Sequence, residues 1–191
     1  MPAPHTVDTS NWEPWQRDYV FGVILVMPPP YVASSIDALR QAYDPKSHAI
    51  CSAHISVSAP LRRELSDRDR GEIQGLLRAV EPFEVHFDGP TASLHRPGVT
   101  CPVAPQERFD ELKYVIHQSS VFKGAVSERR EIPAHMTIAE FVTIAESLKI
   151  VGELANKASS GSFWCDRLEY VAPDSTFRLK HYGTFFLGAH R

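Results

Sequence analysis

Two short segments of this chain carry the same pattern, a histidine followed two residues later by a hydroxyl side chain. The first is Ala53-His54-Ile55-Ser56-Val57, and the second is Ala134-His135-Met136-Thr137-Ile138. Because side chains alternate between the two faces of a strand, each histidine shares a face with its hydroxyl partner. The apolar residues between them point to the other face. The pattern therefore predicts two half-buried strands, each presenting an imidazole and a hydroxyl on one side.

The two motifs occupy equivalent positions in the two halves of the chain. Each half, about residues 18–95 and 96–190, reads as a strand, a helix, the histidine strand, a capped helix and a further strand. The helical segment Ile36-Asp37-Ala38-Leu39-Arg40 is echoed by Phe109-Asp110-Glu111-Leu112-Lys113, and the two histidines lie 81 residues apart. Internal duplication is the simplest explanation. We predict one bilobal α+β domain over residues 1–191, with pseudo-twofold symmetry and the histidine strands facing each other across a central cleft.

Capping signals and apolar periodicity place the expected helices. Ser34 or Ser35 is expected to cap a first helix that ends near Tyr43. Ser66 with Asp69, and Thr143 with Glu146, have the spacing of capping boxes. The expected helices after them run to about residues 80 and 158, and one more helix covers about 106–117.

Apolar runs place the expected strands around these helices. Residues 1–17 are polar and contain prolines, so they predict an irregular arm. The run 19–27 predicts a buried strand stopped by three prolines. Further strands are expected at 84–87 and 99–103, and two closing strands at 163–171 and 177–187.

Composition narrows the classes of function. The chain has 191 residues, 43% of them hydrophobic and 23% charged, which is ordinary for a globular protein. The net charge of −3 argues against long, nonspecific nucleic-acid binding but is compatible with a small anionic ligand or the end of an oligonucleotide. Three distant cysteines, Cys51, Cys101 and Cys165, predict reduced thiols in a cytoplasmic protein. No signal peptide or membrane span is expected, and we expect a monomer.

The histidine pair suggests a chemistry. Two imidazoles with ordinary pKa values can act as one acid and one base near neutral pH. This is the apparatus for breaking a phosphodiester without a metal, so His54 and His135 are the predicted catalytic residues and no cofactor is expected. A zinc site is disfavoured because neither motif has a carboxylate or thiolate on the same face. A serine nucleophile is disfavoured because Ser56 lies outside a G-x-S-x-G turn.

Other side chains are candidates for binding the substrate. Phe141 shares the predicted face of His135 and could stack on a base. His95 and Arg96, and Tyr182 beside Lys180 and His181, lie in or near strands that could border the groove, where a phosphate would favour cations. For each of these, the alternative interpretation is core packing or a solvated surface.

The paired motifs resemble those of the 2H phosphoesterase superfamily, which includes 2′-5′ RNA ligase-like proteins and cyclic phosphodiesterases. The resemblance spans about residues 19–187 and includes the run from Ala53 to Leu61 and the Pro133-to-Ile138 segment. It implies a bilobal α+β fold, catalytic roles for His54 and His135, and phosphate-binding roles for Ser56 and Thr137. Some ligase-like members place an arginine soon after the second motif, where this chain reads Ala139-Glu140-Phe141. That departure counts against a long RNA substrate more than against phosphoesterase chemistry.

The expected function is therefore hydrolysis of a cyclic or 2′-5′ phosphodiester of a nucleotide or a short RNA end. The resemblance implies that hydrolysis of a 2′,3′-cyclic phosphate would leave a 2′-phosphate. The main alternative is a non-catalytic nucleotide-binding or sensing module on the same fold, and a purely structural protein is a third hypothesis. Which histidine is the acid and which the base stays open at this point.

Overall fold

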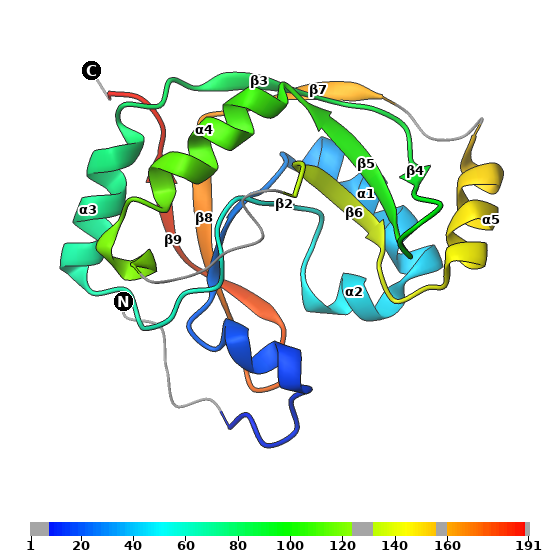
Figure 1. Ribbon diagram of the computed structural model, residues 1–191, viewed down its shortest axis with the longest axis horizontal. Helices are drawn as coiled ribbons and strands as arrows, with labels where there is room; N and C mark the ends of the chain where they lie inside the picture. The colour runs from blue at the N-terminus through cyan, green and yellow to red at the C-terminus, as the bar shows by residue number, and fades with distance from the viewer. Residues whose placement is uncertain (1–7, 124–131, 156–159, 190–191) are drawn as a thin grey trace.

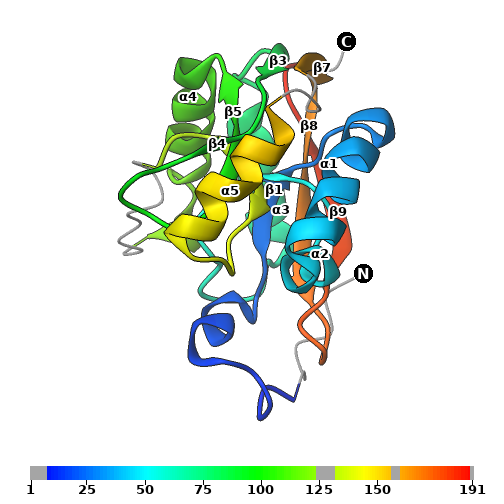
Figure 2. The ribbon, with the colours of Figure 1, turned by 90° about the vertical axis from the view of Figure 1, so that its right-hand side faces the viewer.

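The computed structural model describes residues 8–123, 132–155 and 160–189, and Figures 1 and 2 show its arrangement. Its strands form an antiparallel sheet in the order β7-β3-β5-β6-β2-β1-β8-β9, with β4 pairing to β5. The strands are β1 (Val23–Val26), β2 (Ile55–Ser56), β3 (Phe83–Phe87), β4 (Thr91–Ala92), β5 (Val99–Ala104), β6 (His135–Ala139), β7 (Gly161–Cys165), β8 (Arg167–Pro173) and β9 (Leu179–Phe186).

Helices supply the rest of the core. They are the 3-10 helices η1 (Pro14–Tyr19) and η2 (Ser120–Phe122), and the α-helices α1 (Pro30–Tyr43), α2 (Pro45–Ile50), α3 (Asp67–Leu77), α4 (Gln106–Ile116) and α5 (Ile144–Leu154). Figure 1 shows α3 and α4 towards one end of the sheet and α1, α2 and α5 towards the other. The fold is therefore α+β, as the sequence predicts.

The alternation predicted for the two histidine strands is confirmed on their apolar face. Ile55, Val57, Met136 and Ile138 are completely buried and belong to one hydrophobic core with the inner faces of α1, α3, α4 and α5. Burying these side chains stabilises the sheet by roughly 1.5–3 kcal/mol each relative to leaving them exposed. The opposite face of the same strands is consequently free to carry polar side chains.

The relation between the two histidine strands differs from the expectation. They do not face each other across a groove, because β2 and β6 are hydrogen-bonded neighbours in the middle of the sheet, with Ile55 opposite Met136. β1 flanks β2 on one side, and β5 flanks β6 on the other. Both motifs thus contribute to one continuous surface.

The capping boxes are confirmed and the start of the first helix is not. The Ser66 and Thr143 side chains accept from the N–H groups of Asp69 and Glu146, and each acid reaches back to the cap. In contrast, α1 begins at Pro30 instead of after Ser34 or Ser35. Proline suits the first helical position, because its fixed φ is helical and no N–H is needed there.

Three further segments depart from the expected elements. The short helix α2 was not predicted; Asp44 caps it by accepting from the N–H of Ser47 at 3.0 Å. The expected strand 163–171 is two strands, β7 and β8, that pair with β3 and β1 respectively. Of the expected arm, residues 1–7 lie outside the described part, whereas residues 14–19 form η1, and Trp12 is buried with its indole N–H donating to the Ser175 carbonyl at 3.1 Å.

The cysteines and the helix lengths were also predicted from the sequence. The three cysteines are buried and unpaired, as predicted for free thiols. None of the helices within the described ranges has both the length and the apolar character needed to cross a bilayer. The end expected for the last helix, near residue 158, lies outside the described residues.

Candidate active site

The register of β2 and β6 brings the two motifs together. With Ile55 opposite Met136, the adjacent positions place Ser56 opposite His135 and His54 opposite Thr137. Directly opposed residues of an antiparallel pair have Cβ atoms about 4.5–5.5 Å apart and point to the same face. The two imidazoles and two hydroxyls therefore form one compact group, with the histidines on a diagonal.

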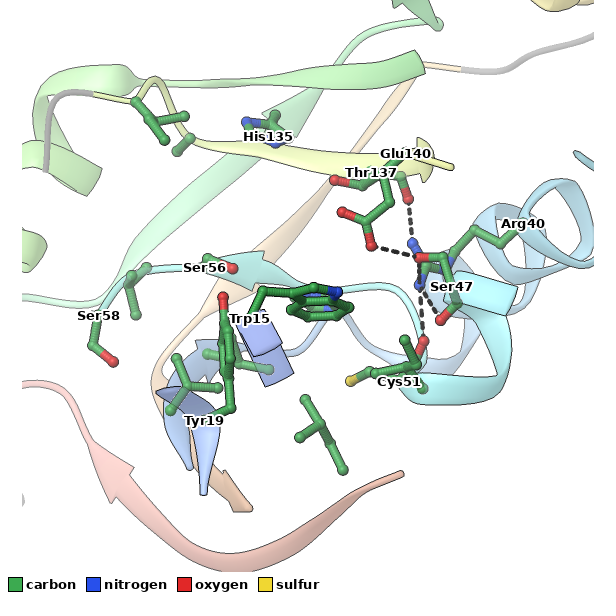
Figure 3. Close-up of a pocket in the computed structure, with 18 of the residues that line it drawn as sticks. Trp15, Tyr19, Arg40, Ser47, Cys51, Ser56, Ser58, His135, Thr137 and Glu140 are labelled. Atoms are coloured by element: carbon green, nitrogen blue, oxygen red, sulfur yellow. Dashed lines mark hydrogen bonds between the residues drawn. The ribbon is translucent and has the colours of Figure 1, made fainter. Parts of the chain in front are cut away.

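A pocket of about 520 Å³ covers this group. This volume lies in the range of about 300–1,000 Å³ that is common for small-molecule sites. Five of the predicted site residues line the pocket: His54, Ser56, His135, Thr137 and Phe141. Figure 3 shows Ser56, His135 and Thr137 on the two neighbouring strands, with Trp15 and Tyr19 below them.

The remaining predicted site residues do not line this pocket. His95 and Arg96 are exposed in the segment before β5. Tyr182, on β9, packs against the hydrophobic core, and its ring centroid lies 6.3 Å from that of Tyr170.

The two imidazole rings are oriented in the same way. The Nδ1 atom of His54 lies 2.7 Å from the carbonyl oxygen of Ser52, and Nδ1 of His135 lies 2.7 Å from the carbonyl oxygen of Pro133. A carbonyl only accepts, so Nδ1 is the donor in both contacts. A neutral ring held in this way keeps its proton on Nδ1 and leaves the Nε2 lone pair for a ligand.

The protonation state of His54 follows from its surroundings. Burial lowers the pKa of His54 to about 4, the Ser52 carbonyl acts in the opposite direction, and the positive charges of Arg40 and His135 lower it further. Asp37 opposes these charges more weakly. Because desolvation disfavours a charged imidazole, His54 is neutral at pH 7.

An aromatic wall, defined here as Trp15, Tyr19, Phe141 and Phe177, bounds the pocket away from the histidines. The Trp15 ring lies 5.2 Å from Phe177, 6.1 Å from Tyr19 and 6.2 Å from Phe141 between centroids. Of these four residues, the sequence pattern indicates only Phe141. The density of aromatic residues at Trp12, Trp15 and Tyr19 was the available signal, but the polar residues between them masked it.

A carboxylate and a buried guanidinium complete the polar lining. Glu140, directly after β6, accepts a hydrogen bond from the Ser47 hydroxyl at 3.2 Å, and Ser47 in turn accepts from Arg40 at 3.0 Å (Figure 3). Lys46 stands 4.1 Å from the centroid of the Phe141 ring and contacts Glu13 at 2.8 Å. Neither Glu140 nor Arg40 was predicted as a site residue.

His117 also lines the pocket, but its hydrogen bonds stabilise the fold. Its Nδ1 donates to the carbonyl of Lys113 at 2.6 Å, and its Nε2 accepts from the N–H of Ala59 at 3.0 Å. Both ring nitrogens are used, so this buried histidine ties α4 to the segment after β2. Within the described ranges, no three histidine, cysteine or acidic side chains gather as metal ligands.

Comparisons with known proteins place this geometry in a family. A search of the solved structures finds a phosphoesterase with a TM-score of 0.56 at 16% identity, covering 87% of this chain and 97% of that one. E. coli LigT complexed with 3′-AMP has a TM-score of 0.56 at 16% identity, with 86% and 96% covered. E. coli LigT complexed with NADP+ has a TM-score of 0.54 at 15% identity, with 87% and 96% covered. At these identities the likeness supports the fold alone.

No curated protein sequence matches this chain. The family model of the 2′-5′ RNA ligase superfamily matches residues 28–176, which include both histidine motifs. The match confirms the resemblance that the two motifs indicate. The chain therefore belongs to the 2′-5′ RNA ligase superfamily.

Proposed function

We propose that this protein is a metal-independent phosphodiesterase that hydrolyses a cyclic or 2′-5′ phosphodiester of a nucleotide or an RNA end. The observation that carries the proposal is the pair of imidazoles in one pocket, each with Nδ1 held by a carbonyl and each beside a hydroxyl from the neighbouring strand. Membership in the superfamily supports the reaction class.

His54 is the general base in this proposal. Because it is neutral at pH 7, its Nε2 can take a proton from water as the water oxygen attacks phosphorus. The protonated His135 then donates from Nε2 to the leaving ribose oxygen. With a 2′,3′-cyclic phosphate, the bond from phosphorus to O3′ breaks and a 2′-phosphate remains. His54 ends protonated and His135 neutral, so one proton must pass back before the next turnover.

The hydroxyls of Ser56 and Thr137 bind the phosphate in the proposal. Each lies opposite the histidine of the other strand, so both flank the diagonal on which the reacting phosphorus would sit. Hydrogen bonds to the nonbridging oxygens favour the transition state if they strengthen as charge develops there. Fixed donors supply this stabilisation without reorganising during the reaction.

The aromatic wall is the proposed position of the nucleoside. Trp15 and Phe141 present rings on which a base could stack, which is typically worth about 1–3 kcal/mol. Glu140 adds a carboxylate at the same end of the pocket, where it would repel a second phosphate. Both features favour a substrate with one phosphodiester over a longer polyanion.

The test is an activity panel of 2′,3′-cyclic, 1″,2″-cyclic and 2′-5′-linked nucleotides, with the product position read by phosphorus NMR. We expect turnover of at least one cyclic substrate, and the same turnover after treatment with EDTA. Loss of activity on chelation with recovery on adding zinc would point to a metallohydrolase. Saturable nucleotide binding without turnover of any substrate would support the alternative, a non-catalytic sensing module.

A further inference from the structure

Two buried cations occupy matching positions in helices α1 and α4. Arg40 is 1% exposed and Lys113 is 3% exposed. Each follows an aspartate by three residues: Arg40 Nε lies 3.5 Å from Asp37 Oδ1, and Lys113 Nζ lies 3.3 Å from Asp110 Oδ1. A buried cation is costly unless it is paired and hydrogen-bonded, so both need a compensating role.

Both cations donate hydrogen bonds to the backbone just before the histidines. Arg40 Nη2 donates to the carbonyl of Cys51 at 2.9 Å, and Lys113 Nζ donates to the carbonyl of Ile132 at 2.7 Å. Cys51 precedes His54 by three residues, and Ile132 precedes His135 by three residues. The two cations therefore hold the same position relative to the two rings.

A second hydrogen bond also occurs in both places: the backbone N–H just before each histidine donates to a side chain of the same helix. The N–H of Ala53, one residue before His54, donates to Asp37 Oδ1 at 2.7 Å. The N–H of Ala134, one residue before His135, donates to Gln106 Oε1 at 2.8 Å, and Gln106 Nε2 also donates to the Ala134 carbonyl at 2.8 Å. The carbonyls that accept from the imidazoles, those of Ser52 and Pro133, lie between the two held positions.

The geometry points to Arg40 with Asp37, and Lys113 with Gln106, as positioning residues that set the orientation of His54 and His135. This inference rests on the proposed function, in which those rings transfer protons. Each helix holds the backbone on both sides of the carbonyl that accepts from an imidazole, and so holds the carbonyl itself. Misplacing a reacting group by about 1 Å costs up to about 100-fold in rate.

A direct role in binding phosphate fits these cations less well. Both terminal nitrogens of Arg40 are already bonded, Nη1 to the Thr137 carbonyl at 2.5 Å and Nη2 to Ser47 and Cys51. Lys113 is not among the residues that line the pocket. Arg40 differs from Lys113 in one respect: through Thr137 it also reaches the other histidine strand.

The second strand offers the cleaner test, because Arg40 holds more groups than Lys113. Lys113→Met removes the donor to Ile132 and keeps an apolar side chain of similar length. Gln106→Ala removes the contacts to Ala134 at a partly exposed site. Lys113→Arg restores a donor, and Lys149→Met and Gln41→Ala, both at exposed helix positions, are the matched controls.

We expect Lys113→Met and Gln106→Ala to lower kcat by about tenfold or more with little change in KM, and Lys113→Arg to recover most of that loss. We also expect ¹⁵N NMR of the His135 ring, recorded at alkaline pH on the neutral form, to show the Nδ1–H tautomer in the wild type and a shift towards the other tautomer in both variants. The controls should match the wild type in both measurements.

Folded Lys113→Met and Gln106→Ala proteins with wild-type kcat and an unchanged His135 tautomer would overturn the inference. If Lys113→Met does not fold, Gln106→Ala and Lys113→Arg decide it by the same two measurements. If the wild type turns over no nucleotide, the proposed function fails, and the NMR comparison still decides whether these residues orient the ring.

Discussion

The two histidine strands each present an imidazole and a hydroxyl, but their surroundings differ. β2 spans only Ile55–Ser56, and the residues leading into it, Cys51 and Ala53, are buried. β6 spans five residues, and it is entered through Ile132, which is 40% exposed, and the exposed Pro133. The enclosed setting of the first motif lowers the pKa of His54 to about 4. A short motif thus sets which groups line the pocket, while the packing around His54 sets the pKa of that ring.

The largest effect is expected from removing either imidazole. His54→Ala and His135→Ala should each lower kcat by about 10²–10⁴-fold, because each removes one partner in proton transfer. The double variant should lose much less than the product of the two, since both groups serve one cycle. Steady-state kinetics on the best cyclic substrate measures this, with His86→Ala, an exposed histidine on β3, as the control. A double variant that stays active would exclude the two-histidine mechanism.

Removing a hydroxyl should cost less than removing an imidazole. A hydrogen bond to a charged group is worth about 1.5–3 kcal/mol, so Ser56→Ala and Thr137→Val should each lower kcat/KM by roughly 10- to 150-fold. Both pH profiles should keep the wild-type shape, because neither change removes a proton-transfer group. Comparing the two variants tests whether the two strands contribute equally to phosphate binding. An effect confined to one of them would show that phosphate contacts only one motif.

The acid limb of the pH–rate profile tests the lowered pKa of His54. Because the base must be neutral, kcat/KM should hold down to about pH 5 and then fall about tenfold per pH unit below about 4, where His54 becomes protonated. The stability of the fold should also decrease at acid pH. As pH falls from 6.5 towards 4, the unfolded chain binds a proton that the folded His54 excludes, so the free energy of unfolding should decrease.

Two measurements check this expectation. One is the profile of kcat/KM against pH, and the other is urea unfolding across the same range for the wild type and His54→Asn. The variant should lose the part of the pH dependence of stability between about pH 4 and 6.5 that belongs to His54. An acid limb centred near pH 6.5 would show that burial does not shift His54 in solution.

The smallest effects are expected from the two capping boxes, one in each half. Ser66→Ala and Thr143→Ala should each lower the free energy of unfolding by about 1 kcal/mol and leave kcat unchanged. Of the two variants, Ser66→Ala should lose more of the free energy of unfolding. Its partner Asp69 is buried and also accepts from Arg63 at 2.5 and 2.7 Å, which holds the pKa of Asp69 well below its usual range. Denaturant unfolding of both variants gives the comparison, and equal losses would contradict it.

Local signals predicted much of this fold. The capping boxes at Ser66 and Thr143 act over three residues, and the faces of the histidine strands follow from alternation between neighbours. The same local signals failed at α1, where the proline at position 30 and not a serine begins the helix. They also failed near residue 166, where one apolar run divides into β7, at one end of the sheet order, and β8, the next-to-last strand at the other.

The candidate site divides in the same way. The motifs themselves indicated His54, Ser56, His135 and Thr137, and all four line one pocket. The aromatic wall was not predicted, because Trp15 and Phe177 are 162 positions apart and Phe177 lies in the turn between β8 and β9. The helix echo from Ile36 and Phe109 was visible as a pattern, but nothing local showed that its cations reach the histidine segments.

Local sequence patterns were enough to predict which side chains share a face, where two helices are capped, and that each histidine is paired with a hydroxyl two residues later. These properties depend on residues within one turn or one strand, where geometry leaves few choices. The pairing of β2 with β6, the desolvation of His54 and the burial of Arg40 and Lys113 became visible in the folded protein. Each depends on contacts between segments far apart in the chain, whose free energy arises when the core closes around them.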